Sequence, residues 1–204
     1  MAQAGGCVTD GAAFRVKFPE DEVREPWLPL LLNAYAVLDA GLAEAIAATG
    51  RRPACRSGCA ACCRQPIPAS SLEVLGLTWY AHRHSRGRRR RALQRSLAAI
   101  REGMDCPFLI EDTCAAYTLR PMACREFVVF GSPCRDGEQP ATTRLPDVLP
   151  LPRAIQRRAF WHMLPYYGLT DPVLREAALR DQLVLRDTGI LQRRDWSWLA
   201  GILV

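Results

Sequence analysis

Residues 55–63 read Cys-Arg-Ser-Gly-Cys-Ala-Ala-Cys-Cys, which places four cysteines within nine residues. Gaps of three and two residues allow neighbouring thiolates to converge on one metal ion, either from one face of a helix or from a tight turn at Gly58. The adjacent cysteines at 62 and 63 behave differently, because vicinal side chains diverge in a strand and lie about 100° apart on a helix. This pair therefore indicates two metals, a polynuclear cluster, or one cysteine that is not a ligand.

A second group of four cysteines follows, with gaps of seven, nine and nine residues that are too wide for zinc-finger spacing. These residues either complete a site begun by the first group or build one with help from the fold. Free cysteine is also among the most buried residue types, and we assign the isolated Cys7 to that ordinary role. Two dense groups favour a metal site instead. Its predicted ligands are Cys55, Cys59, Cys62, Cys63, Cys106, Cys114, Cys124 and Cys134.

The composition is that of a folded globular chain. It has 204 residues, of which 49% are hydrophobic and 24% charged, and this excludes a disordered chain, a collagen-like chain and a coiled-coil rod. Nine cysteines is an odd number, so full disulfide pairing would leave one thiol over. No apolar run approaches the ~20 residues that a membrane span needs, and no signal peptide is evident. We expect a cytoplasmic protein without a membrane partner, where clustered cysteines hold metal or do redox work.

Helical spacing of apolar residues predicts a mainly α fold with irregular cysteine-rich loops around the metal site. Ser70 with Glu73 resembles a capping box, and Asp171 followed by Pro172 is a typical helix start. Residues 106–114 suggest a hairpin or knuckle. The predicted helices cover residues 27–49, 70–82, 88–101, 117–127, 152–164 and 171–185.

We divide the chain into three segments on this basis. Residues 1–25 lack periodicity and are interpreted as a loose lead-in. Residues 26–145 form the predicted metal-binding domain, and residues 146–204 form a helical extension packed on it. Residues 131–152, rich in glycine and proline, are the predicted linker.

The net charge of +6 comes almost entirely from arginine, since Lys17 is the single lysine. This skew is typical of a GC-rich bacterial genome. Seven arginines lie within Arg83–Arg95, which would suit phosphate binding or a solvated helix face. Four consecutive arginines spread around a helix and no aromatic residues interleave with them, so we rank nucleic acid below metal as a partner. Thiolate ligands would also remove much of the positive excess.

Other residues offer weaker candidates. His82 and His84 lie two apart, which places them on different faces of a helix, and His162 fits a helix at the rim of the core. The sequence contains no Gly-rich phosphate loop, no G-x-S-x-G motif and no recognisable triad, so the catalytic residues, if the chain is an enzyme, are unknown.

The short sequence motifs around the cysteines also resemble those of a known family. After residues 55–63 come Cys-Pro-Phe-Leu at 106–109, Cys-Ala-Ala-Tyr at 114–117, Arg-Pro at 120–121 and Cys-Arg-Glu-Phe at 124–127. This order resembles the YkgJ-like CxxCxxCC cysteine-cluster family of zinc- or iron-chelating domains. The resemblance implies one shared metal site built from the eight cysteines, and it implies no reaction. One departure is that three residues, rather than two, separate Cys55 from Cys59.

Three functions follow as hypotheses. The first is a metal-binding protein that chelates zinc or an iron–sulfur centre through the eight cysteines. The second is a redox enzyme or electron carrier that uses an iron–sulfur cluster, which thiolate ligands permit as readily as zinc. The third is a zinc-stapled adaptor that binds nucleic acid or protein through Arg83–Arg95.

Overall fold

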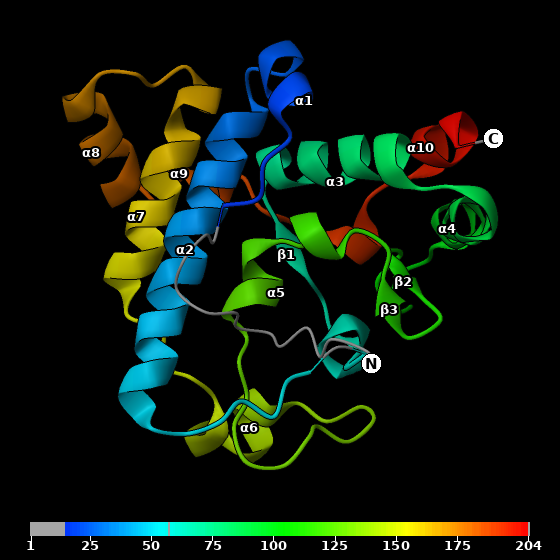
Figure 1. The fold of residues 1–204 in the computed structure, drawn as a ribbon, viewed down its shortest axis with the longest axis horizontal. Helices are drawn as coiled ribbons and strands as arrows, with labels where there is room; N and C mark the ends of the chain where they lie inside the picture. The colour runs from blue at the N-terminus through cyan, green and yellow to red at the C-terminus, as the bar shows by residue number, and fades with distance from the viewer. Residues whose placement is uncertain (1–14, 57, 204) are drawn as a thin grey trace.

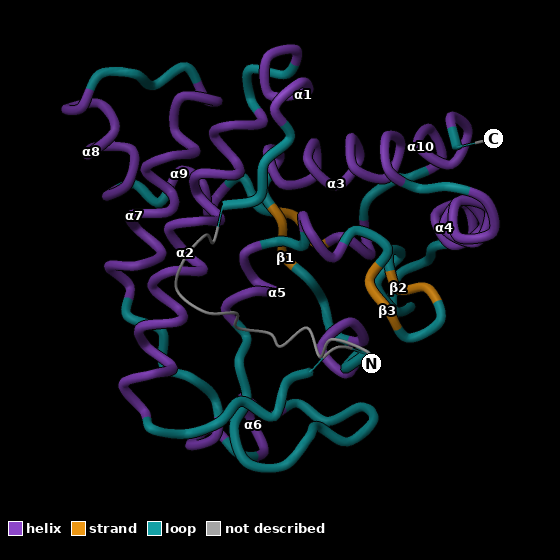
Figure 2. Tube along the Cα trace, in the orientation of Figure 1, coloured by secondary structure: helices purple, strands orange, loops and turns teal. Residues whose placement is uncertain are grey.

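The computed structural model describes residues 15–56 and 58–203, and within them the mainly α prediction is confirmed (Figures 1 and 2). Cys7 and most of the predicted lead-in lie outside the described residues. The helices are α1 Pro19–Arg24, α2 Leu28–Thr49, α3 Ser71–His84, α4 Gly87–Ala99, α5 Met122–Glu126, α6 Pro140–Thr143, α7 Arg153–Met163, α8 Pro172–Arg180, α9 Leu183–Arg186 and α10 Ser197–Ile202.

Within the described residues, the strands form two short antiparallel pairs. In the first, β1 (Pro68–Ala69) pairs with β4 (Gly189–Ile190), which joins the middle of the chain to its C-terminal part. In the second, β2 (Leu109–Ile110) pairs with β3 (Thr113–Cys114) to form a hairpin. The hairpin predicted between residues 106 and 114 is therefore present.

The structure has two halves with separate apolar cores (Figure 1). We call α2, α7, α8 and α9 the helical half, in which α2 and α7 lie side by side. We call residues 54–69, α4, residues 106–124, β4 and α10 the cysteine half. α3 contributes to both halves, since Leu72 belongs to the first core and Leu77 to the second. The segment 106–124 also contributes to both, since Leu119 and Met122 pack in the first core. The segment 146–204 also supplies elements to both halves.

α2 is the central helix of the helical half. Leu28, Leu31, Leu38 and Leu42 recur at intervals of three to seven residues and are buried against the first core. A Cβ atom at Gly41 would collide with Ile155, so glycine at this position allows the close approach of α7. By length and composition alone α2 is apolar enough to cross a membrane, which we did not expect from the sequence. In the structure it is a core helix whose buried residues pack within the protein.

Two helix starts follow the predicted side-chain chemistry. Ser70 Oγ accepts from the Glu73 amide at 3.4 Å, and Glu73 Oε2 accepts from the Ser70 amide at 2.8 Å, which completes the capping box of α3. Asp171 Oδ1 accepts from the Val173 amide at 2.8 Å at the start of α8. These caps satisfy amides that have no partner inside the first helical turn.

Two helix predictions were wrong in their extent. The helix expected over 117–127 is a short 3₁₀ turn, Tyr117–Leu119, followed by α5, because Pro121 lacks an amide hydrogen and restrains the residue before it. The helix expected over 171–185 is divided at Gln182, whose φ is 54°, into α8 and α9. The predicted linker contains α6 and a 3₁₀ turn at Leu145–Asp147.

Candidate metal centre

One cavity of about 390 Å³ in the cysteine half collects cysteines from both sequence groups. Its lining includes Cys55, Cys59, Cys62, Cys63, Cys106, Cys114 and Cys124. Cys134 lines an adjoining hollow that also includes Cys59. The fold therefore gathers all eight predicted ligands into one region, although they extend over 80 residues of sequence.

The first cysteine group lies on turns rather than on a helix face. The Cys59 amide donates to the Arg56 carbonyl at 3.0 Å, and Gly58 has a φ of 79°, which favours glycine. Cys62 and Cys63 then lie on a 3₁₀ turn, Ala61–Arg64. Of the two geometries considered from the sequence, the turn is the one observed.

Backbone hydrogen bonds join the first group to the second. The Cys106 amide donates to the Cys63 carbonyl at 2.8 Å, so a main-chain contact joins the two groups directly. The Leu109 amide then returns to the Cys106 carbonyl at 2.9 Å, and Leu109 pairs with Cys114 across the hairpin. This arrangement fixes the backbone positions of three cysteines around the cavity.

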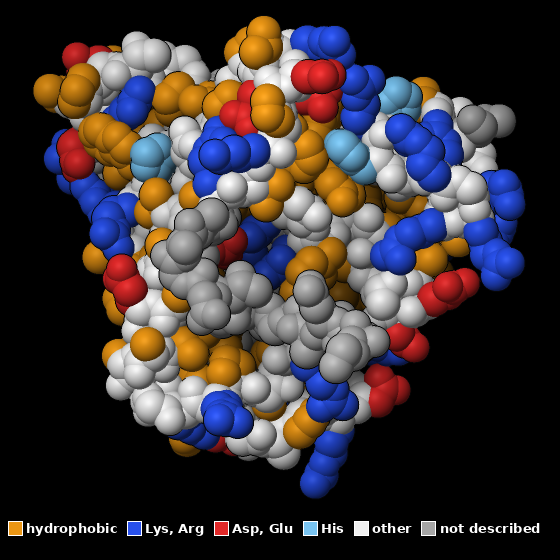
Figure 3. All heavy atoms as spheres, in the orientation of Figure 1, with side chains coloured by type: hydrophobic (Ala, Val, Ile, Leu, Met, Phe, Trp, Pro, Cys, Tyr) orange, Lys and Arg blue, Asp and Glu red, His pale blue; other side chains and the backbone are white. Residues whose placement is uncertain are grey.

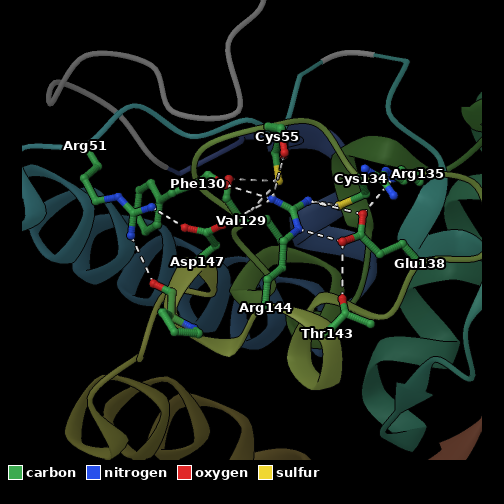
Figure 4. Close-up of polar contacts among 12 residues, drawn as sticks. Arg51, Cys55, Val129, Phe130, Cys134, Arg135, Glu138, Thr143, Arg144 and Asp147 are labelled. Atoms are coloured by element: carbon green, nitrogen blue, oxygen red, sulfur yellow. Dashed lines mark hydrogen bonds and ion pairs between the residues drawn. The ribbon is translucent and has the colours of Figure 1, made fainter.

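Cys55 is attached to a different segment. The Val129 amide donates to Cys55 Sγ at 3.4 Å, and the Ala54 amide donates to the Val129 carbonyl at 2.7 Å (Figure 4). An amide aimed at sulfur is a typical second contact of a metal-bound thiolate. The longer gap between Cys55 and Cys59 therefore does not remove Cys55 from the cavity.

Cys124 sits on α5, which is held by two buried charged residues. Glu73 Oε1 accepts from the Met122 amide at 2.7 Å, at the first residue of α5. Arg125 pairs with Asp39 at 2.6 Å and donates to the Thr118 carbonyl at 2.6 Å. Burial raises the pKa of the Glu73 carboxyl, while the hydrogen bonds from Met122 and Ser70 oppose that shift.

The role of Glu73 in holding α5 was missed by the sequence analysis, which placed this residue only in a capping box. Its second oxygen reaches a residue 49 positions further along the chain, and no local sequence pattern indicates that contact. Arg125 likewise stacks over the Tyr35 ring at 4.0 Å, so it joins the cysteine region to α2.

Cys134 has its own basic neighbour, Arg144. The Arg144 Nη2 atom donates to Cys134 Sγ at 3.6 Å, and the Arg144 Nε atom pairs with Glu138 at 2.7 Å (Figure 4). Further bonds to the Phe130 and Ser132 carbonyls, at 3.2 and 2.8 Å, fix the guanidinium. Arg144 was also missed, because it lies ten positions after Cys134 and no local sequence pattern connects the two.

The buried thiols oppose an accumulation of negative charge. Burial, followed by the nearby thiols Cys114 and Cys62, raises the pKa of Cys106 to about 12. Burial likewise raises the pKa of Cys124 well above its ordinary value. A hydrogen bond from Cys63 lowers the pKa of Cys62 to about 7 and raises that of Cys63. Cys62 is therefore the thiol of this group that ionises most readily. A bound cation would be needed to stabilise further thiolates beside it.

The donor set fits a metal that prefers sulfur. Cys59, Cys62, Cys63, Cys106, Cys114, Cys124 and Cys134 are free thiols, and soft thiolate ligands select zinc and iron–sulfur centres. Within residues 15–56 and 58–203, no three His, Cys, Asp or Glu side chains already stand in a closed coordination arrangement. The cavity brings the thiols to one place without their converging on one point.

The histidines lie away from this cavity. His84 stacks on Tyr80 with ring centroids 4.7 Å apart and also contacts Phe18 and Trp79. His82 is exposed at the end of α3, and His162 lines a separate cleft beside Trp161. The sequence analysis treated the three histidines as weaker candidates than the cysteines for metal binding, and none of them lines the cysteine cavity.

The arginine run is partly used for structural contacts. Arg90 donates to the Ile202 and Leu203 carbonyls at 3.0 and 2.9 Å, and Arg83 pairs with Asp21 at 3.1 Å. Figure 3 shows basic side chains gathered over α4, so an exposed basic surface remains there.

The fold and the cavity define a mainly α protein with a thiol-lined site. Residues 54–144 match the family model CxxCxxCC, described as "Putative zinc- or iron-chelating domain". The matched segment includes all eight clustered cysteines. Over this segment, the match confirms the family resemblance inferred from the cysteine motifs. No curated protein and no solved structure matches the chain.

Proposed function

We propose that the chain is a cytoplasmic bacterial metal-binding protein that holds zinc or an iron centre through its eight clustered cysteines. The observation that carries the proposal is the single cavity lined by seven thiols from two separate sequence groups. Free thiols suit the reducing cytoplasm, where clustered cysteines more often bind metal than form disulfides.

The ligands would divide by their surroundings. Cys62, Cys63, Cys106, Cys114 and Cys124 form the inner set, which is close enough for mutual electrostatic effects. Cys55, Cys59 and Cys134 form the outer set. Burial, followed by the nearby Cys59 thiol, raises the pKa of Cys134. A metal ion bound by the inner set would offset the negative charge of these buried thiols when they ionise.

The surrounding residues hold this ligand set in place. Glu73 fixes the start of α5, and with it Cys124, while the Cys106 amide ties the second group to Cys63. Arg144 directs a positive charge at Cys134. These contacts orient the donors before metal binds, which is the usual role of the residues behind metal ligands.

A redox role through an iron–sulfur cluster is the second candidate. Seven thiols around one cavity exceed the four that a tetrahedral zinc site uses, and the adjacent Cys62 and Cys63 suit more than one metal atom. Visible absorbance that bleaches with dithionite would support this candidate. A colourless protein that contains only zinc would exclude it.

Single substitutions test the ligand assignment. Cys106→Ser and Cys124→Ser remove inner thiols, whereas Cys7→Ser is the matched control outside the matched segment. We expect metal per chain to fall in the first two variants and to stay at the wild-type value in the third. Unchanged metal content in both inner variants would contradict the proposal.

A further inference from the structure

We propose that the cysteine cavity also receives a small organic anion, a carboxylate or phosphate ester with an apolar body, whose charged end is bound by Arg89 and Arg120. The inference rests on the proposed function in one respect, because the anion would lie beside the thiol-bound metal. It assigns the cavity a ligand besides the metal.

The size and walls of the cavity support an organic ligand. A volume of about 390 Å³ lies within the range of about 300–1,000 Å³ that is typical of small-molecule sites. Besides the thiols, its lining is largely apolar, although Arg56 and Asp112 also line it and Asp112 pairs with Arg64. The apolar side chains are Ile67, Leu77, Phe108, Leu109, Phe127 and Leu191. Such walls would pack against the carbon skeleton of an organic ligand. They are not required for binding a metal ion alone.

The two arginines reach the cavity from different elements and are fixed in advance. The Arg89 Nη2 atom, from α4, donates to Thr113 Oγ1 at 3.1 Å and to the Cys114 carbonyl at 2.9 Å. Arg120 donates to the Tyr117 carbonyl at 3.1 Å and stacks over the Tyr117 ring at 4.1 Å. A guanidinium fixed in this way loses little freedom when it binds an anion.

The charge on these arginines is not compensated by acidic side chains. Across the described ranges, 15–56 and 58–203, neither Arg89 nor Arg120 has a carboxylate within ion-pair distance. Arg64 is a useful contrast, because it lies nearby and pairs with Asp112 and Asp136 at 3.4 and 3.1 Å. The arginines at the cavity thus keep donors available for an anion that carries carboxylate or phosphate oxygens.

A competing account is that Arg89 and Arg120 serve only to neutralise the thiolates. Their observed contacts go to oxygen atoms and to an aromatic ring, whereas Arg144 directs a nitrogen at the Cys134 sulfur. Both cations do lower thiol pKa values nearby, Arg120 that of Cys62 and both that of Cys114. The two accounts differ in what an arginine substitution would change, which makes them separable by experiment.

The test is a fluorescence titration of the purified, metal-containing chain with 8-anilinonaphthalene-1-sulfonate, an anion with an apolar body. N-phenyl-1-naphthylamine has the same apolar body without the charge and serves as the uncharged probe. The variants are Arg89→Gln and Arg120→Gln, with Arg95→Gln as the matched control on the exposed side of α4. Arg89→Lys tests whether charge alone restores binding.

We expect the dissociation constant of the anionic probe to rise about tenfold in each of the first two variants, because each loses a charge-assisted hydrogen bond. The uncharged probe and the Arg95→Gln control should change little, and Arg89→Lys should recover part of the affinity. Inorganic phosphate and acetate, added as competitors, identify which anion the arginines prefer.

Two results would overturn the inference. The first is an unchanged affinity for the anionic probe in both Arg89→Gln and Arg120→Gln. The second is a loss of metal in these variants together with an equal fall in affinity for the charged and the uncharged probe, which would show that the arginines act as counter-ions of the thiolates. The proposed function fails separately: a wild-type chain without metal would refute it, whether or not the probe depends on Arg89.

Discussion

The helical half and the cysteine half achieve order by different means. In the helical half, α2 and α7 pack along their length, and leucines such as Leu31 and Leu38 are fully buried. In the cysteine half, the elements that carry the cysteines are two to five residues long and face a cavity. Both halves bury apolar side chains of their own. The second half, whose core includes Phe108 and Trp196, also contains the thiol-lined cavity that the proposed metal would occupy.

Metal removal should produce the largest difference between the halves. We expect a chelator to lower amide protection over residues 54–69 and 106–124, while α2 and α7 keep theirs. Structural zinc contributes on the order of 10 kcal/mol in small zinc domains, so the loss should exceed that of any single substitution. Hydrogen exchange with and without chelator measures both regions in one sample. Equal protection in the two states would mean that the cysteine half folds without metal.

Leu38→Ala should have the next largest effect, and in the opposite half. Leu38 has no exposed surface, so its truncation should lower the free energy of unfolding by about 2–5 kcal/mol through lost burial and a cavity. Metal content per chain should not change, because the substitution lies outside the cysteine half. Chemical denaturation together with metal analysis checks both points, and a parallel loss of metal would show that the halves are not independent.

Glu73→Ala tests the link between the halves. The substitution leaves the buried Met122 and Ser70 amides without their acceptor, which should cost about 1–3 kcal/mol. Because the Met122 amide begins α5, metal affinity should fall as well. Ser70→Ala is the control, since it removes the Ser70 hydroxyl, which caps α3 and donates to Glu73 Oε2, at a cost of about 1 kcal/mol, but leaves the bond between Glu73 and the Met122 amide in place. Equal metal affinity in the two variants would refute a positioning role for Glu73.

Asp171→Ala should have the smallest effect of the series. Asp171 caps α8 in the helical half through the amides of Val173 and Leu174, and the loss of such a cap costs about 1 kcal/mol. We expect a small fall in melting temperature with unchanged metal content. A change in the visible or metal signal of this variant would indicate coupling that the two separate cores do not explain.

Sequence patterns predicted the helical half better than the cysteine half, for a physical reason. The apolar period of α2 and the caps at Ser70 and Asp171 are local signals, and the structure confirms them. The interruption before α5 has a local signal in Pro121, which the predicted helix over 117–127 overlooked. The break at Gln182 has no glycine or proline to mark it, and the sequence predicted a continuous helix there. Local periodicity cannot express contacts that form only after folding.

The candidate site shows the same division. The cysteine spacing predicted that eight residues lie in one region, because cysteines at that density are typical of a metal site. The sequence did not show that Glu73 holds α5 or that Arg144 reaches Cys134. Both contacts join residues through the fold rather than through a motif. The proximity of the eight cysteines was therefore predictable, whereas the contacts that hold them were not.

Metal and acid-labile sulfide analysis of the wild-type chain, purified without oxygen and with a visible spectrum of the same sample, tests the central claim most directly. The account predicts a stoichiometric metal, either zinc without colour or iron with sulfide and a brown colour. Iron with sulfide would favour the redox candidate, and zinc would favour a chelating or structural site. A chain that folds with no bound metal would contradict the claim that the cysteine cavity is a metal centre.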